Sequence, residues 1–283
     1  IYRLSMMISA VETKLIQIYR KHIQRRTIER GLFYTGGRAN IGDSMVPWLI
    51  NNVGGKEISY SNPREVNGPH LFTIGSILQY ADANSYIWGS GFISEDSKVH
   101  SKPAKVNAVR GPLTAKRLKG LTNQDCDVFC DPALLTPRYI EPTIELGTTK
   151  IGLIPHYVDK DKLKASKIFN HNSVKLCDVE TENIQQFIND ICSCEVVISS
   201  SLHGIILAEA FGIPAVWAKF GNDVHGKDFK FYDYYLSTGR KRVEPKCFYT
   251  ITELDLLNIL QVKESTISSM GSSLLECFPN VFK

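Results

Sequence analysis

The chain has 283 residues, of which 43% are hydrophobic and 22% charged, a composition typical of a soluble globular protein with one large or two ordinary domains. A net charge of +4 is too small to indicate a nucleic-acid-binding protein, and no apolar run is long enough to cross a bilayer. The seven cysteines lack CxxC spacing and an accompanying histidine pair, so we expect free thiols in a reducing compartment and no metal site.

Residues 1–30 are predicted to form a basic amphipathic helix. Apolar side chains recur at near-helical spacing between Val11 and Ile23, and lysines and arginines occupy most of the other positions. Two interpretations stay open. Residues 9–30 lie on an anionic membrane surface, or the helix packs on the protein with a solvated cationic face.

From residue 31, short apolar runs alternate with helix-like stretches, which predicts parallel sheets covered by helices. The expected strands of a first domain, residues 31–145, are 32–34, 71–74, 85–88, 106–109 and 127–129. The pattern breaks at 137–149 and restarts with expected strands at 151–154, 174–176, 195–198 and 215–218. The prediction is an α/β fold of two Rossmann-like, doubly wound domains facing a cleft. The second domain covers 146–245, and a helical tail covers 246–283.

A glycine-rich stretch, Thr35 to Asp43, follows the first expected strand. Its spacing is not GxGxxG, so a nicotinamide or flavin site is not indicated. One of Asp43 and Ser44 is expected to cap a helix that begins near Met45. Asn40 and the other residue of that pair are then left to bind hydroxyl groups.

Arg110 ends an expected strand just before a helix predicted from Pro112 to Gly120. A guanidinium beside the free N–H groups of a helix start suits a carboxylate or a phosphate. The alternative is a salt bridge between the domains, and we favour the anion role.

Two histidines follow strands of the second domain. His156 comes after 151–154, and His203 comes after 195–198 at the start of a helix expected over 204–211. Ligands of open α/β folds bind at this edge of the sheet, and a helix N-terminus favours an anion. His203 is therefore the predicted centre of the chemistry, and the alternative is a histidine that only packs the turn. The aromatic and basic residues of 226–242 line a sugar or anion pocket, or pack on the core.

Taken in order, these stretches resemble the polysaccharide pyruvyl transferase family, in its bacterial exopolysaccharide and capsule branch. The resemblance spans roughly residues 32–245. The motifs that carry it are Asn40-Ile-Gly-Asp43, Arg110-Gly-Pro-Leu-Thr114, Asp131-Pro-Ala-Leu-Leu135, Ile154-Pro-His-Tyr157, Ser199-Ser-Ser-Leu-His-Gly204 and Phe229-Lys-Phe-Tyr-Asp-Tyr-Tyr235.

The resemblance implies a GT-B-like pair of domains, phosphoenolpyruvate as the donor, and neither a metal nor a cofactor. The implied product is a pyruvate ketal on sugar hydroxyls of a surface polysaccharide precursor. The implied partners are phosphoenolpyruvate and a lipid-linked oligosaccharide or polysaccharide, and no nucleic acid. The implied location is the cytoplasm, with peripheral attachment to the inner face of the cytoplasmic membrane.

The site residues follow from these motifs. His203 is the candidate for proton transfer. Many relatives carry an arginine where this chain has Ser201, and we expect Lys230 or Arg240 to supply that cation. The donor-binding candidates are Arg110, Ser199, Ser200, Ser201, Leu202, Gly204, Lys230 and Arg240, and the acceptor-binding candidates are Gly37, Asn40, Asp43 and His156. Two other functions stay open, a GT-B glycosyltransferase with a nucleotide-sugar donor and a non-catalytic membrane-associated scaffold of glycan assembly.

Overall fold

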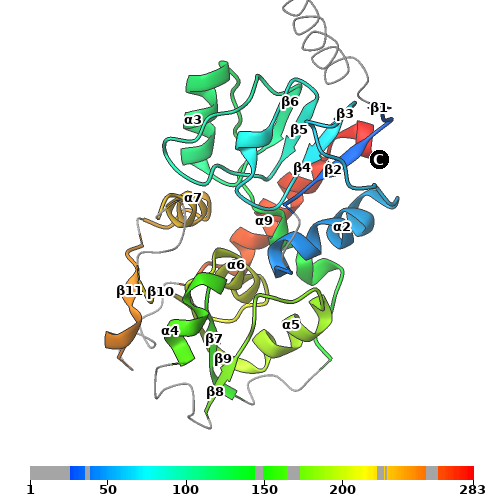
Figure 1. Ribbon diagram of the computed structural model, residues 1–283. Coiled ribbons are helices and arrows are strands. Elements are labelled where there is room, and N and C mark those ends of the chain that lie inside the picture. The colour runs from blue at the N-terminus through cyan, green and yellow to red at the C-terminus, as the bar shows by residue number, and fades with distance from the viewer. Residues whose placement is uncertain are drawn as a thin grey trace, which may run out of the picture.

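The structure is a computed structural model that describes residues 26–35, 39–143, 149–164, 173–221, 226, 228–241, 243–252 and 261–283. It contains two α/β units, each built on a parallel sheet (Figure 1). The predicted α/β class with two parallel sheets is therefore confirmed.

The first sheet has the strand order β2-β4-β5-β6, and all its pairs are parallel. Its strands are β2 (Gly31–Phe33), β4 (His70–Phe72), β5 (Ser85–Trp88) and β6 (Lys105–Ala108). A separate parallel pair is formed by β1 (Arg26–Thr27) and β3 (Val66–Asn67). The helices of this part are α2 (Ile41–Gly54), α3 (Pro112–Thr122) and the 3-10 helices η1 (Leu78–Tyr80) and η2 (Pro132–Arg138).

The second sheet has the order β11-β10-β9-β7-β8 and is also parallel. Its strands are β7 (Thr149–Ile154), β8 (Val174–Leu176), β9 (Cys194–Ser199), β10 (Ala215–Lys219) and β11 (Lys246–Cys247). Its helices are η3 (Tyr157–Asp159), α4 (Lys160–Lys164), α5 (Ile184–Cys192), α6 (Leu202–Ala210) and η5 (Phe248–Thr250). The chain leaves β7 toward β8 and then returns to β9 on the other side. This reversal makes the gap between β7 and β9 the point where a ligand is expected.

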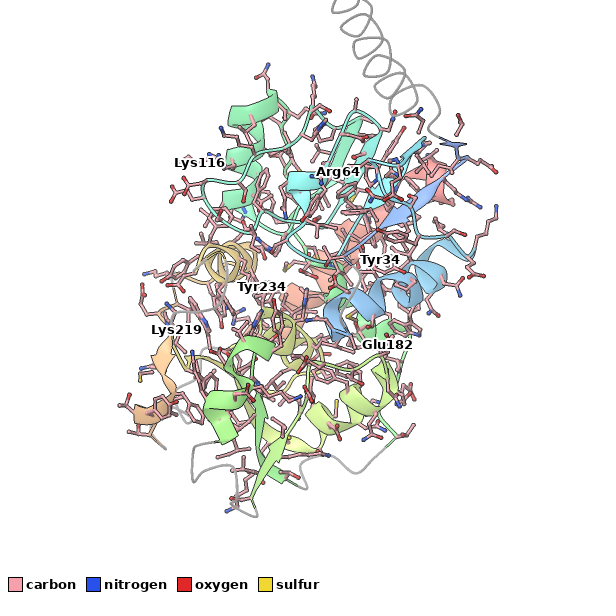
Figure 2. All side chains as sticks on the ribbon, viewed as in Figure 1. Tyr34, Arg64, Lys116, Glu182, Lys219 and Tyr234 are labelled. Carbon is pink, nitrogen blue, oxygen red and sulfur yellow. The ribbon has the colours of Figure 1, made fainter. Side chains whose placement is uncertain are left out.

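The C-terminal part of the chain returns to the first unit. Helix α7 (Phe229–Ser237) packs against α3, and Figure 1 shows α9 (Glu264–Glu276) running back beside the first sheet. The Trp88 indole donates to the Leu274 carbonyl at 2.9 Å, and 3-10 helix η6 (Asn280–Phe282) ends the described chain. One cluster of buried apolar residues, with Leu32, Leu134 and Ile205 among its members, runs through both units. The two units thus share a core. Figure 2 shows the side chains of both units on the ribbon.

The structure corrects some of the sequence-based expectations, and others concern residues that it does not describe. The strand expected at 127–129 is reduced to one bridge between Val109 and Phe129, because Asp131 and Pro132 begin η2 directly afterwards. The helix expected near Met45 begins at Ile41 instead. Residues 1–25 lie outside the described chain, but 26–27 form a strand, so the first helix does not extend to residue 30. The tail expected to be helical over 246–283 begins with strand β11 of the second sheet, and its residues 253–260 lie outside the described chain. Within the described residues, the helices are too short or too polar to cross a membrane.

Candidate functional site

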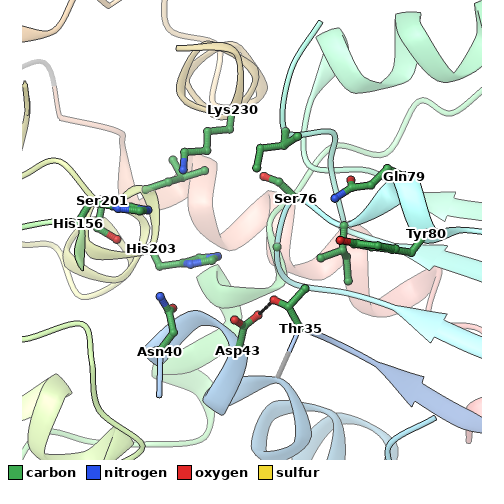
Figure 3. Close-up of a pocket in the computed structure, with 14 residues that line it drawn as sticks. Thr35, Asn40, Asp43, Ser76, Gln79, Tyr80, His156, Ser201, His203 and Lys230 are labelled. Atoms are coloured by element: carbon green, nitrogen blue, oxygen red, sulfur yellow. Dashed lines mark hydrogen bonds between the residues drawn. The ribbon is translucent and has the colours of Figure 1, made fainter. Parts of the chain in front are cut away.

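A cavity of about 310 Å³ lies between the two units, at the carboxyl ends of their strands (Figure 3). Residues that follow β2, β4 and β5 meet there with residues that follow β7 and β9 and with one side chain of α7. Its described lining consists of Thr35, Asn40, Asp43, Gly75, Ser76, Ile77, Gln79, Tyr80, Ile93, His156, Ser201, Leu202, His203 and Lys230.

Two of the predicted serines shape the wall without lining the cavity. Ser199 Oγ donates to the Ile154 carbonyl, and Ser200 Oγ donates to the Asp159 carboxylate, each at 2.8 Å. Both side chains are buried. The structure therefore corrects their expected role. They hold the ends of β7 and β9 together at the switch point, and they are not among the described residues that line the cavity.

The first turn of α6 opens into the cavity through Ser201, Leu202 and His203. The first N–H groups of a helix lack intrahelical acceptors and carry a partial positive charge, which attracts an anion. Gly204 belongs to the same turn but faces the sheet, where an added Cβ would lie 2.6 Å from Ile154 Cγ2. This position therefore requires glycine for close packing of helix on strand.

His203 lies directly on the backbone of α2. A Cβ built on Gly42 would come within 2.0 Å of His203 Nδ1, so only glycine leaves room for the ring. The Nε2 atom is buried and has no hydrogen-bond partner among the described residues. Burial lowers the pKa of His203 to about 3, and the charges of Lys230, Arg110 and His156 add to this effect. The imidazole is therefore neutral at pH 7.

Lys230 brings a cation to the cavity from α7. Its side chain is 9% exposed, and its ammonium forms no ion pair with a described carboxylate. Burial, followed by the charge of Arg110, lowers the pKa of Lys230 to about 8. The helix is anchored by the Phe231 ring, which stacks on Trp217 at 4.4 Å between centroids. Lys230 and Ser201 line one cavity, the arrangement that a substitute cation requires.

Arg110 has a different environment from the one expected of a donor ligand. Its guanidinium is 1% exposed and donates to Asp233 Oδ2 at 3.0 Å, to Ser76 Oγ at 2.6 Å and to the Phe92 carbonyl at 2.6 Å. Thr114 donates to the same aspartate through its N–H and its hydroxyl. The expected donor contact is corrected to the salt bridge that the sequence left as an alternative. Arg110 thus links the first unit to α7 through Asp233, and it also donates to Ser76 of the cavity wall.

Arg240, the other residue expected to replace the cation, is paired with a carboxylate. Its Nη1 and Nη2 contact Glu209 Oε1 and Oε2 at 2.6 and 2.8 Å, and it is not among the residues that line the cavity. The Tyr234 hydroxyl donates to the same carboxylate at 2.6 Å. This buried group joins the end of α7 to α6, so Arg240 fixes the helix that carries Lys230.

The first unit contributes a carboxylate. Asp43 lies in the first turn of α2 and accepts a hydrogen bond from Thr35 Oγ1 at 2.8 Å. Burial raises the pKa of Asp43 to about 6, against the opposing effect of the bonds from Thr35. The helix cap is Asn40, not Asp43 or Ser44, and its Oδ1 accepts from Gly42 N at 3.0 Å.

Part of the cavity wall was missed by the sequence-based prediction. Gln79 and Tyr80 come from η1, and Figure 3 shows the Tyr80 hydroxyl directed into the cavity. The Oε1 atom of Gln79 is buried and has no hydrogen-bond partner within the described ranges. The sequence signal that could have identified these two residues is their position just after the expected strand 71–74. Gly37 lies outside the described residues, and His156 stands beside Ser201, across the cavity from Tyr80 (Figure 3).

The two walls therefore differ in chemistry. The second unit and α7 present Lys230, two histidines and a helix N-terminus, which together favour an anion. The first unit presents hydroxyl, amide and carboxylate groups, which favour a neutral ligand with many hydroxyls. A volume of about 310 Å³ is at the low end of the roughly 300–1,000 Å³ of small-molecule pockets, so the ligands are small.

Comparisons with known proteins give three findings. The family model described as polysaccharide pyruvyl transferase matches residues 32–218. An uncharacterized protein of Acanthamoeba polyphaga mimivirus is 32% identical over 197 residues, which are 66% of this chain and 67% of that protein. A solved structure of a functionally uncharacterized protein from Klebsiella pneumoniae covers 85% of this chain and 98% of its own, with 16% identity and a TM-score of 0.44.

Proposed function

The chain belongs to the polysaccharide pyruvyl transferase family, and we propose that it transfers a pyruvyl group from phosphoenolpyruvate to two hydroxyls of a polysaccharide precursor as a ketal. Family membership supports pyruvyl transfer to a polysaccharide. The donor and the ketal product are our inference. We also infer that the two units, with the chain returning through α7 and α9, form the GT-B-like arrangement.

The observation that carries the donor assignment is the wall with Lys230, His203 and the first turn of α6 in one small cavity. Lys230 is buried without a described carboxylate, and His203 has a buried nitrogen that finds no partner in the part of the chain that the structure describes. Both features cost stability unless an anionic ligand compensates them. Phosphoenolpyruvate carries a phosphate and a carboxylate within a few bonds, and it fits a small cationic cavity.

The proposed reaction balances with donor and acceptor alone. A proton adds to C3 of phosphoenolpyruvate, and the positive charge that develops at C2 is attacked by the first sugar hydroxyl. The bond between C2 and the phosphate oxygen then breaks, its electron pair leaves with phosphate, and the second hydroxyl closes the ring. One of the two hydroxyl protons restores the acid that protonated C3. The other hydroxyl proton leaves on phosphate. No electron acceptor is required.

We assign the proton delivery to His203, which donor binding would charge. Raising its pKa from about 3 to near 7 requires about 5 kcal/mol, at 1.36 kcal/mol per unit. One negative charge 4 Å from the ring contributes about 4 kcal/mol at an effective dielectric constant of 20. A donor with two anionic groups is therefore sufficient to protonate the imidazole when it binds.

Thermal-shift titration of the full chain tests this function against its rivals. Phosphoenolpyruvate at 100 times its Kd should stabilise the protein by about 2.7 kcal/mol, while UDP-glucose should have no effect. Stabilisation by UDP-glucose alone would identify a glycosyltransferase instead. No stabilisation by either ligand would favour a non-catalytic scaffold.

A further inference from the structure

The first-unit wall of the cavity is built from hydrogen-bonding groups without a described cation. Thr35, Asp43, Gln79 and Tyr80 line this side, and Figure 3 shows them across the cavity from Lys230. The Asp43 carboxylate would repel a multiply charged donor that lay against it. The same carboxylate accepts hydrogen bonds well from the hydroxyls of a neutral sugar.

Gln79 and Tyr80 have features that are typical of ligand-binding residues. The Oε1 atom of Gln79 is buried and accepts no hydrogen bond from any described residue, which costs about 1–3 kcal/mol unless a ligand supplies a donor. The Tyr80 ring is fixed by the Phe33 ring at 5.4 Å and by the Arg64 guanidinium at 5.3 Å. This packing holds its hydroxyl in the direction of the cavity (Figure 3).

Asp43 is positioned for chemistry on a hydroxyl. The Thr35 hydroxyl holds Asp43 Oδ1 at 2.8 Å, and α2 fixes the backbone below it. The His203 ring rests on Gly42, the residue before Asp43, so the histidine and the carboxylate face the same space. An acid for the donor and a base for the acceptor are thereby close together.

We propose that Thr35, Asp43, Gln79 and Tyr80 form the acceptor subsite, which binds a neutral sugar ring with Asp43 as the base for its attacking hydroxyl. The hydroxyl proton moves to the Asp43 carboxylate while the hydroxyl oxygen bonds to C2 of the donor, and the carboxyl then passes the proton to the departing phosphate. Thr35 acts as a positioning residue. This inference rests on the proposed function, because it assumes a donor on the opposite wall.

Saturation-transfer NMR tests the binding part without turnover. The probes are methyl glycosides of the common hexoses, added to the full chain at saturating phosphoenolpyruvate. Gln79→Leu and Tyr80→Phe should each weaken glycoside binding by about 2- to 12-fold, the effect of one lost hydrogen bond. Tyr60→Phe is the matched control, since Tyr60 packs on the same Phe33 ring but does not line the cavity. The variants should leave the thermal shift by phosphoenolpyruvate unchanged.

Several outcomes would overturn the subsite. Unchanged glycoside binding in Gln79→Leu and Tyr80→Phe would do so, as would saturation transfer to none of the glycosides. A loss of phosphoenolpyruvate binding in these two variants would place the donor on this wall instead. If wild type binds a glycoside but not phosphoenolpyruvate, the proposed function fails while the sugar site stands, so the two failures are distinguishable.

Asp43→Asn tests the proton transfer with the glycoside that binds best. Phosphate release by wild type should rise with pH through about 6, because the base must be ionised. The variant should be about 10²- to 10⁴-fold slower and should lose this rise, while glycoside binding persists. A variant with the wild-type rate, or with the wild-type pH profile, would remove Asp43 from the chemistry.

Discussion

Replacing Lys230 with methionine is expected to stabilise the protein without ligand and to abolish its response to phosphoenolpyruvate. Lys230 is 9% exposed, and burial is the main cause that lowers its pKa from 10.5 to about 8. Methionine keeps most of the side-chain length and removes the charge. The expected gain in stability follows because wild type buries a cation that has no described carboxylate as a partner, and the variant does not.

The magnitude follows from the pKa shift. The folded-state pKa lies below the unfolded value, so the folded protein binds this proton less tightly. The difference of about 2.5 units corresponds to about 3 kcal/mol, which destabilises wild type fully below pH 8 and disappears as the pH rises toward 10.5. Lys230→Met should therefore unfold several degrees above wild type at pH 7, and the gap should close near pH 10.

Thermal unfolding at both pH values, with and without phosphoenolpyruvate, provides the assay. Lys116→Met is the matched control, because the Lys116 side chain is exposed on α3. A variant no more stable than wild type at pH 7 would refute the reasoning, as would a gap that does not shrink at high pH.

Two further predictions concern the residues that hold the site. Gly42→Ala should displace the His203 ring and slow phosphate release at least 10-fold, whereas Gly120→Ala, which has no neighbour within 4 Å, should leave activity unchanged; equal activity of both variants would contradict the contact. Arg110→Met leaves Asp233 buried and unpaired, and urea unfolding should show a loss of about 3–5 kcal/mol. The double variant Arg110→Met with Asp233→Leu should recover most of that loss, and a double variant as unstable as the single one would argue against the ion pair as its cause.

The sequence predicted the parts of this fold that depend on local patterns. Apolar runs before turns identified the strands that frame the cavity, and the carboxyl edge of the second sheet placed His156 and His203 together. The sequence-based prediction put the helix cap at Asp43 or Ser44, a few positions after the observed cap, Asn40. Asn, Asp and Ser all serve as helix caps, and three such residues occur within residues 40–44.

The misassigned residues depend on contacts between distant segments. Arg110 has the sequence surroundings of an anion ligand, but its partner Asp233 lies 123 residues further along the chain. Glu209 engages Arg240 in the same way, 31 residues away. No local pattern indicates which arginines will be neutralised and which lysine will be left without a carboxylate.

Proton uptake on donor binding is the most direct measure of the central claim, that an anion enters this cavity and charges His203. Calorimetric titration of phosphoenolpyruvate into wild type at pH 7, in two buffers of different ionisation enthalpy, should show binding with net uptake of protons. His203→Gln should bind with markedly less uptake. Absence of binding, or binding with the same proton balance in wild type and variant, would contradict the account.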